Sequence, residues 1–270
     1  MPTVIGKPNL STEKAWSRGR LQLVDTCPAC GSHARGQKSY VRQDDSMSMP
    51  DLWEMVTCQD CKSLYLDPRP DDKSLPRAYE DYFTHTRIPE SYSEGGLGDL
   101  LWRFINGYLN VRFGMSRQPA NRFGHFVFRL AAPWRMKLDY YCRNLYRKDF
   151  PDRGSLLDLG CGNGSFLERA VEMGWDAVGC EPDGAAVEVC RSAGLEVIHG
   201  DVFTEALDGR SFDVVTVSHV IEHVPDMDAA LSRISSIVKS GGTVWFALPN
   251  PDSIIMKLFA SAALNLHFPC

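Results

Sequence analysis

The chain has 270 residues, which is enough for one sizeable domain and a smaller one. Hydrophobic residues make up 44% of it and charged residues 23%, the proportions of a folded globular protein rather than of a disordered chain. A net charge of −5 argues against a general nucleic-acid-binding protein, and no apolar run reaches the roughly 18 residues that a membrane-spanning helix needs.

The first 26 residues form a polar leader without the apolar run of a signal peptide, so the predicted compartment is the cytoplasm. Residues 27–70 then contain two C-x-x-C pairs, Cys27 with Cys30 and Cys58 with Cys61. Four thiolates suit a closed tetrahedral zinc site, which stabilises a fold but leaves no position open for catalysis. We therefore predict a small zinc-ribbon-like module that holds structural Zn²⁺. Two disulfides or unligated thiols are the alternatives.

Residues 71–153 are predicted to form a helical cap or linker. Within them, residues 101–150 carry ten Lys or Arg but only two acids, Asp139 and Asp149, and twelve of the fifty are aromatic. Three interpretations remain open. The segment is a lid over an anionic substrate, such as a nucleotide- or lipid-linked sugar. It makes a shallow contact with a membrane surface, peripheral at the inner face. Or it is a cap whose aromatic residues form core and whose arginines are solvated.

Residues 154–250 alternate short apolar runs with amphipathic stretches, which predicts an α/β domain with a parallel sheet covered by helices. The expected strands are Ser155–Leu159, Trp175–Cys180, Leu195–His199, Phe212–Ser218 and Thr243–Leu248. The expected helices are Gly164–Met173, Gly184–Ala193 and Met227–Lys239, the last stopped by Gly241 and Gly242. A further helix could begin at Pro251 and run toward Asn265.

A glycine-rich turn joins the first of these strands to the first helix. Gly160, Gly162 and Gly164 allow the backbone to pass close to a ligand, and the following helix offers unpaired N–H groups to an anionic group. Glu181 comes 21 residues after Gly160, a spacing that suits a carboxylate bound to ribose hydroxyls. A dinucleotide-binding domain is an alternative, but its third glycine would fall one place later. A tight turn that binds nothing is the other.

The successive motifs DLGCGNG, VGCEPD, GDVF, FDVVTVSHVIEHVPD and VKSGGTVWFALPN resemble those of class I methyltransferases, which have a Rossmann-like fold. The resemblance implies that S-adenosylmethionine is the cofactor. Each motif would contact a different part of it. The loop of Gly160, Cys161, Gly162, Asn163 and Gly164 would lie along the methionine part, and Asp158 would anchor the amino group. Glu181, followed by Pro182, would hold the ribose, Asp201 and Val202 would meet the adenine, and Ser218 and His219 would line the site beside the methyl group.

A general base is needed only if the acceptor must lose a proton. His219 is the best-placed candidate because it ends a central strand, and its near-neutral titration suits base work. His223 is a second catalytic candidate with a more structural character. Glu222 together with these histidines could instead bind a divalent ion.

The pattern CPACG…CQDCKSLYLDPRP before such a core resembles bacterial enzymes that methylate sugars and other small metabolites. It implies a small-molecule acceptor, either a sugar or a lipid- or nucleotide-linked glycan precursor, and contacts to the cofactor from Tyr79 and Tyr82. The alternative is a non-catalytic methyltransferase-like binding or assembly protein. The family normally has seven strands, whereas only five are predicted here, so we expect a domain over 154–270 that is C-terminally truncated.

Overall fold

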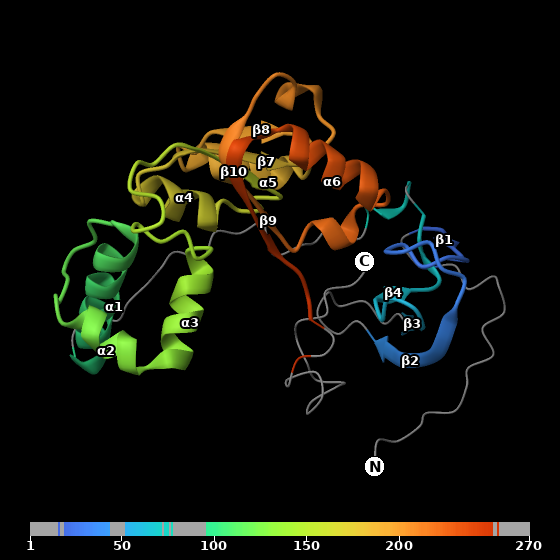
Figure 1. Cartoon of the computed structure of the whole chain (residues 1–270), viewed down its shortest axis with the longest axis horizontal. Coiled ribbons are helices and arrows are strands. Elements are labelled where there is room, and N and C mark those ends of the chain that lie inside the picture. Colours follow the sequence, from blue (N-terminus) through green and yellow to red (C-terminus); the bar gives the residue numbers. More distant parts are fainter. Residues whose placement is uncertain are drawn as a thin grey trace, which may run out of the picture. The chain divides into compact units, whose positions relative to one another are not determined.

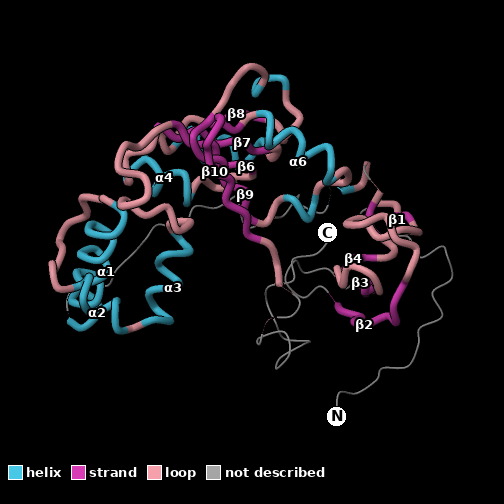
Figure 2. Tube along the Cα trace, in the orientation of Figure 1, coloured by secondary structure: helices cyan, strands magenta, loops and turns pink. Residues whose placement is uncertain are grey.

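The computed structural model describes residues 16, 19–43, 52–71, 73–75, 77, 96–250 and 253 (Figures 1 and 2). The chain forms two compact units, residues 1–82 with 249–270 and residues 83–248. The expected helix over 251–265 and the candidate contacts Tyr79 and Tyr82 lie outside the described residues. Each unit is built around its own core.

The first unit is a small all-β module. Its strand β1 (Leu21–Gln22) pairs antiparallel with β5 (Arg69–Pro70), and β2 (Arg35–Gln43), β3 (Leu52–Cys58) and β4 (Leu64–Leu66) form an antiparallel sheet in the order β2-β3-β4. Val56 and Tyr65 pack with two cysteines in its core. The carboxylate of Asp67 accepts a hydrogen bond of 2.8 Å from the backbone N–H of Val24 and pairs with Arg35, which ties the ends of the module together.

The second unit begins with three helices, here called the helical cap: α1 (Gly96–Phe113), α2 (Gly124–Leu130) and α3 (Ala132–Tyr141). A Cβ added to Gly124 would lie 1.9 Å from the carbonyl oxygen of Phe104, so glycine is what allows α1 and α2 to pack at backbone contact. Tyr108 and Phe128 fill the interface, and the Tyr108 hydroxyl donates a 2.5 Å hydrogen bond to buried Asp139. The cap is therefore a packed structure rather than a linker.

The rest of the second unit is a parallel sheet of five strands in the order β10-β9-β6-β7-β8. The strands are β6 (Ser155–Leu159), β7 (Asp176–Glu181), β8 (Val197–His199), β9 (Phe212–Ser218) and β10 (Val238–Ala247). The helices between them are α4 (Ser165–Glu172), α5 (Gly184–Ser192) and α6 (Met227–Ser236), with short 3₁₀ turns η3 (Glu205–Leu207) and η4 (Ile221–His223).

Both faces of this sheet are covered. Leu156 and Val214 belong to a core shared with α4, α5 and the helical cap, whereas their neighbours Leu157 and Val215 belong to a second core with α6. Successive residues of a strand point to opposite faces, so the near-continuous apolar runs of β6 and β9 follow from burial on two sides. The predicted Rossmann-like α/β fold, whose parallel sheet has five strands among the described residues, is confirmed.

The prediction for the segment after α6 is wrong in one respect. The helix ends at Ser236, and β10 starts at Val238 and runs through Gly241 and Gly242 instead of starting after them. A register irregularity between Val238 and Thr243 accommodates the glycines, and Gly241 has φ 78°. Glycines therefore serve as a bulge in this strand rather than as a helix stop. None of the described helices is long and apolar enough to cross a membrane.

Candidate functional site

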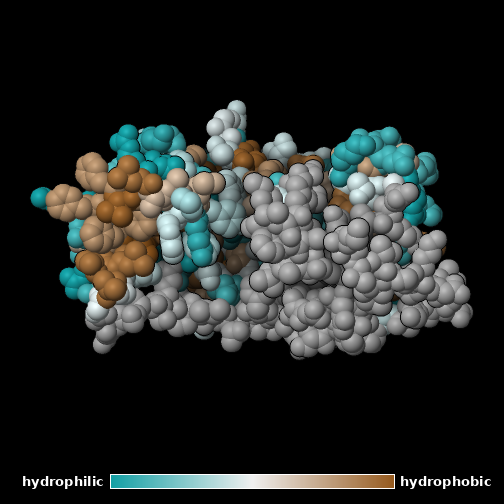
Figure 3. Space-filling model, turned by 90° about the horizontal axis from the view of Figure 1, so that it is seen from below, coloured by the Kyte–Doolittle hydropathy of each residue, from teal (hydrophilic) through white to brown (hydrophobic). Residues whose placement is uncertain are grey.

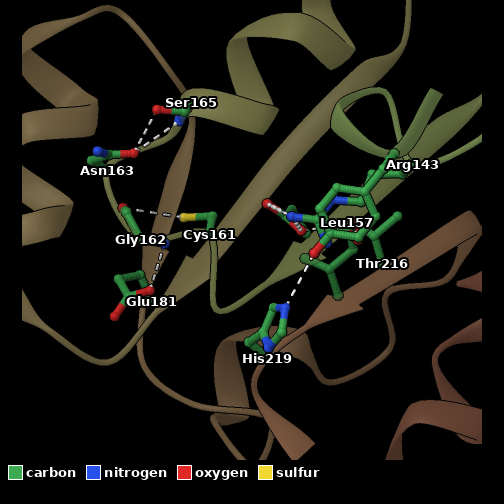
Figure 4. Close-up of polar contacts among 11 residues, drawn as sticks. Arg143, Leu157, Cys161, Gly162, Asn163, Ser165, Glu181, Thr216 and His219 are labelled. Carbon is green, nitrogen blue, oxygen red and sulfur yellow. Dashed lines mark hydrogen bonds and ion pairs between the residues drawn. The ribbon is translucent and has the colours of Figure 1, made fainter. Parts of the chain in front are cut away.

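The candidate site lies where the order of the strands reverses. From β6 the chain proceeds outward to β7 and β8 on one side, then returns to β9 and β10 on the other. The loops that follow β6 and β9 therefore leave the sheet in opposite directions at the carboxyl ends of the two central strands, where open parallel sheets bind their ligands. The glycine-rich turn follows β6, and His219 follows β9 (Figure 4).

The glycine-rich turn has a backbone that only glycine adopts without strain. Gly160, Gly162 and Gly164 have φ values of 67°, 53° and 78°. A Cβ on Gly160 would lie 2.3 Å from a methyl carbon of Val220. The side-chain oxygen of Asn163 accepts hydrogen bonds from the backbone N–H and the hydroxyl of Ser165, at 3.2 Å and 2.7 Å, where α4 begins. Cys161 is buried.

Glu181, at the end of β7, holds this turn in place. Its Oε2 accepts a 2.8 Å hydrogen bond from the N–H of Gly162, and its Oε1 accepts one of 3.1 Å from the N–H of Asp183. The side chain is 8% exposed, and burial raises the pKa of this carboxyl against the opposing effect of the two backbone bonds. Each oxygen still has a lone pair for a ligand hydroxyl.

Asp158 forms a buried ion pair with a residue of the segment after the helical cap. Its Oδ1 accepts a 2.7 Å hydrogen bond from the hydroxyl of Thr216 and lies 3.2 Å from Nη2 of Arg143. Asp158 is fully buried, which raises its pKa, while Arg143 and Thr216 oppose that rise. Burial likewise lowers the pKa of Arg143, and Asp158 opposes it. Two opposite charges therefore sit beside the glycine-rich turn, away from water.

Arg143 is a candidate that the sequence did not reveal. Its guanidinium lies over the rings of Phe166 and Trp245, with its central carbon 4.2 Å and 5.0 Å from their centroids. Its Nη1 is buried and has no hydrogen-bond partner. Arg143 and Asn144 both have left-handed backbones, with φ 52° and 56°, which turn the chain from α3 back toward the sheet. A buried donor without a partner is costly, and this nitrogen still has a hydrogen bond to offer.

His219 lies in an equally unusual backbone conformation. It has φ 54°, and its N–H donates to the carbonyl of Ala247 over 2.9 Å. Its Nε2 is 3.1 Å from the hydroxyl of Tyr140, at the end of α3, and Figure 4 draws this contact as the dashed line from His219. Its Nδ1 is 3.4 Å from a carboxylate oxygen of Glu222. Strained non-glycine residues concentrate at functional sites because the surrounding structure must hold them there. Tyr140 is the second site residue that the sequence did not reveal.

The other predicted site residues lie on the same edge. Ser218, half-buried, ends β9, and His223 closes the η4 turn with its N–H bonded to the carbonyl of Val220 at 2.9 Å. After β8, Asp201 is exposed and accepts a 2.9 Å bond from the N–H of Phe203, whereas Val202 is buried. The carbonyl oxygen of Pro182 lies 3.1 Å from Nε2 of His199.

The four cysteines of the first unit converge. Their sulfur atoms all lie within 4.8 Å of one another, with Cys27 3.6 Å from Cys61 and Cys30 3.7 Å from Cys58. The two C-x-x-C turns have matching backbones, in which Gly31 and Lys62 both take a positive φ, of 69° and 64°. In the described part of the chain this is the only group of three or more Cys, His, Asp or Glu ligand atoms that close together. The histidines and Glu222 form no such group.

The known proteins that this chain is similar to are methyltransferases. A family model described as "Methyltransferase domain" matches residues 123–269. The "Ubiquinone biosynthesis O-methyltransferase" of Methylococcus capsulatus is 38% identical over 101 residues, which are 35% of this chain and 43% of that protein. The protein of the same name in Brucella anthropi is 36% identical over 119 residues, 42% of this chain and 47% of that one. Each match thus spans less than half of the relative's length.

A solved structure described as a SAM-dependent methyltransferase from Archaeoglobus fulgidus is 28% identical, with a TM-score of 0.36, over 42% of this chain and 53% of that one.

Proposed function

Because the chain belongs to the methyltransferase-domain family, we propose that it is an enzyme that transfers a methyl group from S-adenosylmethionine to a small molecule. The observation that carries this proposal is the buried pair of Asp158 and Arg143 beside the glycine-rich turn. The methionine end of the donor bears an ammonium and a carboxylate. A site that offers one buried carboxylate and one buried guanidinium therefore fits both ends of that zwitterion.

Different residues of the candidate site would bind different parts of the donor. Nη1 of Arg143, a buried donor without a partner, would bind the carboxylate. Asp158 would hold the ammonium, through water if its bonds to Thr216 and Arg143 persist. Glu181 would accept the ribose hydroxyls through its second lone pairs. The adenine would meet Asp201 and Val202, and the remaining contacts would come from the turn of Gly160, Cys161, Gly162, Asn163 and Gly164 with Pro182 and Ser218.

The donor supplies, when bound, a methyl group made electrophilic by the attached sulfonium. The protein then has to orient the acceptor and exclude water, and orientation can lower the barrier by about 7–11 kcal/mol. We propose that His219 takes the proton of the acceptor. Glu222, 3.4 Å from Nδ1, favours a proton on that nitrogen and leaves the lone pair on Nε2. The Tyr140 hydroxyl, 3.1 Å from Nε2, donates to this lone pair and orients the ring until the hydroxyl of the acceptor takes its place.

For the acceptor we propose a sugar or a lipid- or nucleotide-linked glycan precursor, most simply an anionic one. The support is the basic character of residues 101–150 and the combination of a four-cysteine module with a methyltransferase domain. The printed names of the curated relatives mention ubiquinone biosynthesis and no sugar. The choice of a sugar therefore rests on the resemblance of the cysteine pattern and the core that follows it to bacterial enzymes that methylate sugars. No nucleic acid is expected as a partner, given the net charge of −5.

For the four cysteines we propose a structural Zn²⁺ site. A tetrahedron with Zn–S bonds of about 2.3 Å has sulfur atoms about 3.8 Å apart. The separations of 3.6 Å and 3.7 Å for the pairs Cys27–Cys61 and Cys30–Cys58 are close to that value. Four protein ligands complete the tetrahedron, so the ion would stabilise the module and take no part in methyl transfer.

The organisation that we propose has four parts: a leader over 1–26, the zinc module over 27–70, the cap segment over 71–153 and the donor-binding domain over 154–270. The cytoplasm remains the proposed compartment.

Calorimetry with S-adenosylmethionine tests donor binding, and release of S-adenosylhomocysteine from pools of sugars and lipid-linked sugars tests transfer. We expect micromolar binding and product release with at least one pool. A protein that binds no donor would contradict the proposal at its base. Binding without turnover on any pool would favour the non-catalytic alternative, a methyltransferase-like binding or assembly protein.

A further inference from the structure

The helical cap exposes an apolar surface that its own packing does not use. On α2 the exposed side chains recur at helical spacing on the face opposite buried Phe128, and Trp134 and Met136 are exposed on the following helix α3. Together they form the cap patch: Phe123, Phe126, Val127, Leu130, Trp134 and Met136. Their exposed fractions run from 44% to 89%, with Leu130 at the upper end. Figure 3 shows hydrophobic side chains gathered over the cap. Exposed apolar side chains that gather on one part of a surface often mark a docking site.

The cap patch lies among positive charges. Residues 122–141 carry Arg122, Arg129, Arg135 and Lys137 and a single acid, Asp139. That acid is 5% exposed and is held in the core by the Tyr108 hydroxyl, so it does not offset the surface charge. No ion pair among the described residues involves the four basic residues. A chain with net charge −5 thus presents an apolar and basic face in one place.

We propose that the cap patch and its basic residues bind the surface of anionic lipid bilayers. Aromatic and aliphatic side chains enter the headgroup region without needing a shape-matched partner, and arginine and lysine gain from the negative surface potential. Trp134, 62% exposed on α3, has the amphipathic ring that favours this interface. A second copy of the chain is a poorer occupant, because it would bring two basic faces together.

The same helix connects this surface to the candidate site. α3 has ten residues and so spans about 15 Å, with Trp134 near its start and Tyr140, the partner of His219, near its end. When the helical cap is bound to a bilayer, the candidate site would then lie close to an amphiphilic acceptor that resides in the membrane. This consequence rests on the proposed methyl transfer, whereas bilayer binding itself does not.

Co-sedimentation with vesicles tests the proposal on the 270-residue chain, without donor or acceptor. We expect binding to phosphatidylcholine vesicles that contain phosphatidylglycerol, no binding to phosphatidylcholine alone, and release at high salt. Leu130→Ser with Trp134→Ser should lower the partition coefficient at least tenfold, and Arg129→Glu with Lys137→Glu should do the same. Because the assay needs no turnover, failed methyl transfer would leave its result unchanged.

Two control variants match these changes elsewhere in the second unit. Val171→Ser with Leu231→Ser alters side chains that are 50% and 40% exposed on α4 and α6, and Arg191→Glu with Arg210→Glu reverses the same amount of charge. Both should bind vesicles like the unaltered chain, and circular dichroism should show all four variants folded. Absence of vesicle binding at low salt, or equal losses in test and control variants, would overturn the proposal. So would a dimer in sedimentation velocity that only Leu130→Ser with Trp134→Ser dissociates.

Discussion

The hydroxyl of Tyr140 lies 3.1 Å from Nε2 of His219, so the last turn of α3 touches the residue that follows the central strand β9. These two residues are 79 positions apart in the chain. The contact gives the helical cap a direct part in the geometry of the candidate site, because the orientation of the imidazole depends on a helix outside the sheet.

Tyr140→Phe keeps the aromatic ring and removes only this hydroxyl. We expect kcat to fall about fivefold with little change in KM for the donor, since one hydrogen bond of about 1 kcal/mol that orients the base is lost. Tyr141→Phe is the matched control, because Tyr141 is similarly exposed and has no such bond to His219. Steady-state kinetics of both variants make the comparison. Equal rates in the two would show that the hydroxyl does not act through His219.

His219→Asn tests the imidazole of this residue apart from its backbone conformation. Asparagine tolerates the left-handed conformation at φ 54°, so the loop should keep its shape while the imidazole is lost. We expect turnover to fall by about 10²–10⁴-fold, the range typical of a lost general base, and donor affinity to change only a few-fold. His223→Asn should have a much smaller effect on turnover. If His223→Asn were the more damaging of the two, the assignment of the base would be reversed.

Arg143→Met should weaken donor binding by about tenfold to a hundredfold, because a charge-assisted contact to the carboxylate is lost. It should also destabilise the fold by about 3–5 kcal/mol, since Asp158 would remain buried without its partner. Adding Asp158→Asn should recover most of the stability without recovering affinity. Calorimetry and denaturant unfolding measure the two quantities separately. Recovery of donor affinity in the double variant would mean that neither charge contacts the donor, and that Arg143→Met loses affinity only because the buried carboxylate is left unpaired.

Gly160→Ala should abolish donor binding, because its φ of 67° disfavours any side chain and the new Cβ would lie 2.3 Å from Val220. Gly209→Ala is the control for backbone strain alone: φ is 69°, but nothing lies within 4 Å of its Cβ. It should cost about 1–2 kcal/mol of stability and leave donor affinity intact. Adding Val220→Ala to Gly160→Ala should relieve the collision in part. Normal binding by Gly160→Ala would contradict the proposed path of the donor along this turn.

Purified protein should contain one zinc ion per chain, which elemental analysis can count. Cys58→Ser, which removes a buried sulfur from the cluster, should abolish the metal and unfold the first unit, with the loss followed by proteolysis of residues 19–71. Cys142→Ala is the control, since it removes a described cysteine outside the four-sulfur group and should leave the metal content unchanged. A metal-free Cys58→Ser protein as resistant to proteolysis as its parent would deny the ion a structural role.

Much of the α/β architecture could be predicted from local sequence. The strands Ser155–Leu159 and Phe212–Ser218 have the bounds that were expected, because an apolar run flanked by glycine or polar residues is a local signal of a strand buried on both faces. The glycine-rich turn could be predicted for the same reason, because residues 160–164 set its conformation by themselves. The role of Gly241 and Gly242 could not be predicted, because a glycine pair fits a helix stop and a strand bulge equally well. Only the pairing of β10 with β9 decided between the two.

The sequence by itself determined the class of fold, the family and the positions of the glycine-rich turn, Glu181 and His219 in chain order. Tertiary structure alone decided that Arg143 pairs with Asp158 and that Tyr140 meets His219. Neither Arg143 nor Tyr140 stands in a motif, and both lie in a segment whose composition equally favoured a solvated cap. Their roles arise from contacts between elements distant in the chain, which depend on how α3 and the left-handed residues Arg143 and Asn144 return the backbone to the sheet. Local patterns of residues do not predict how the backbone after α3 returns to the sheet.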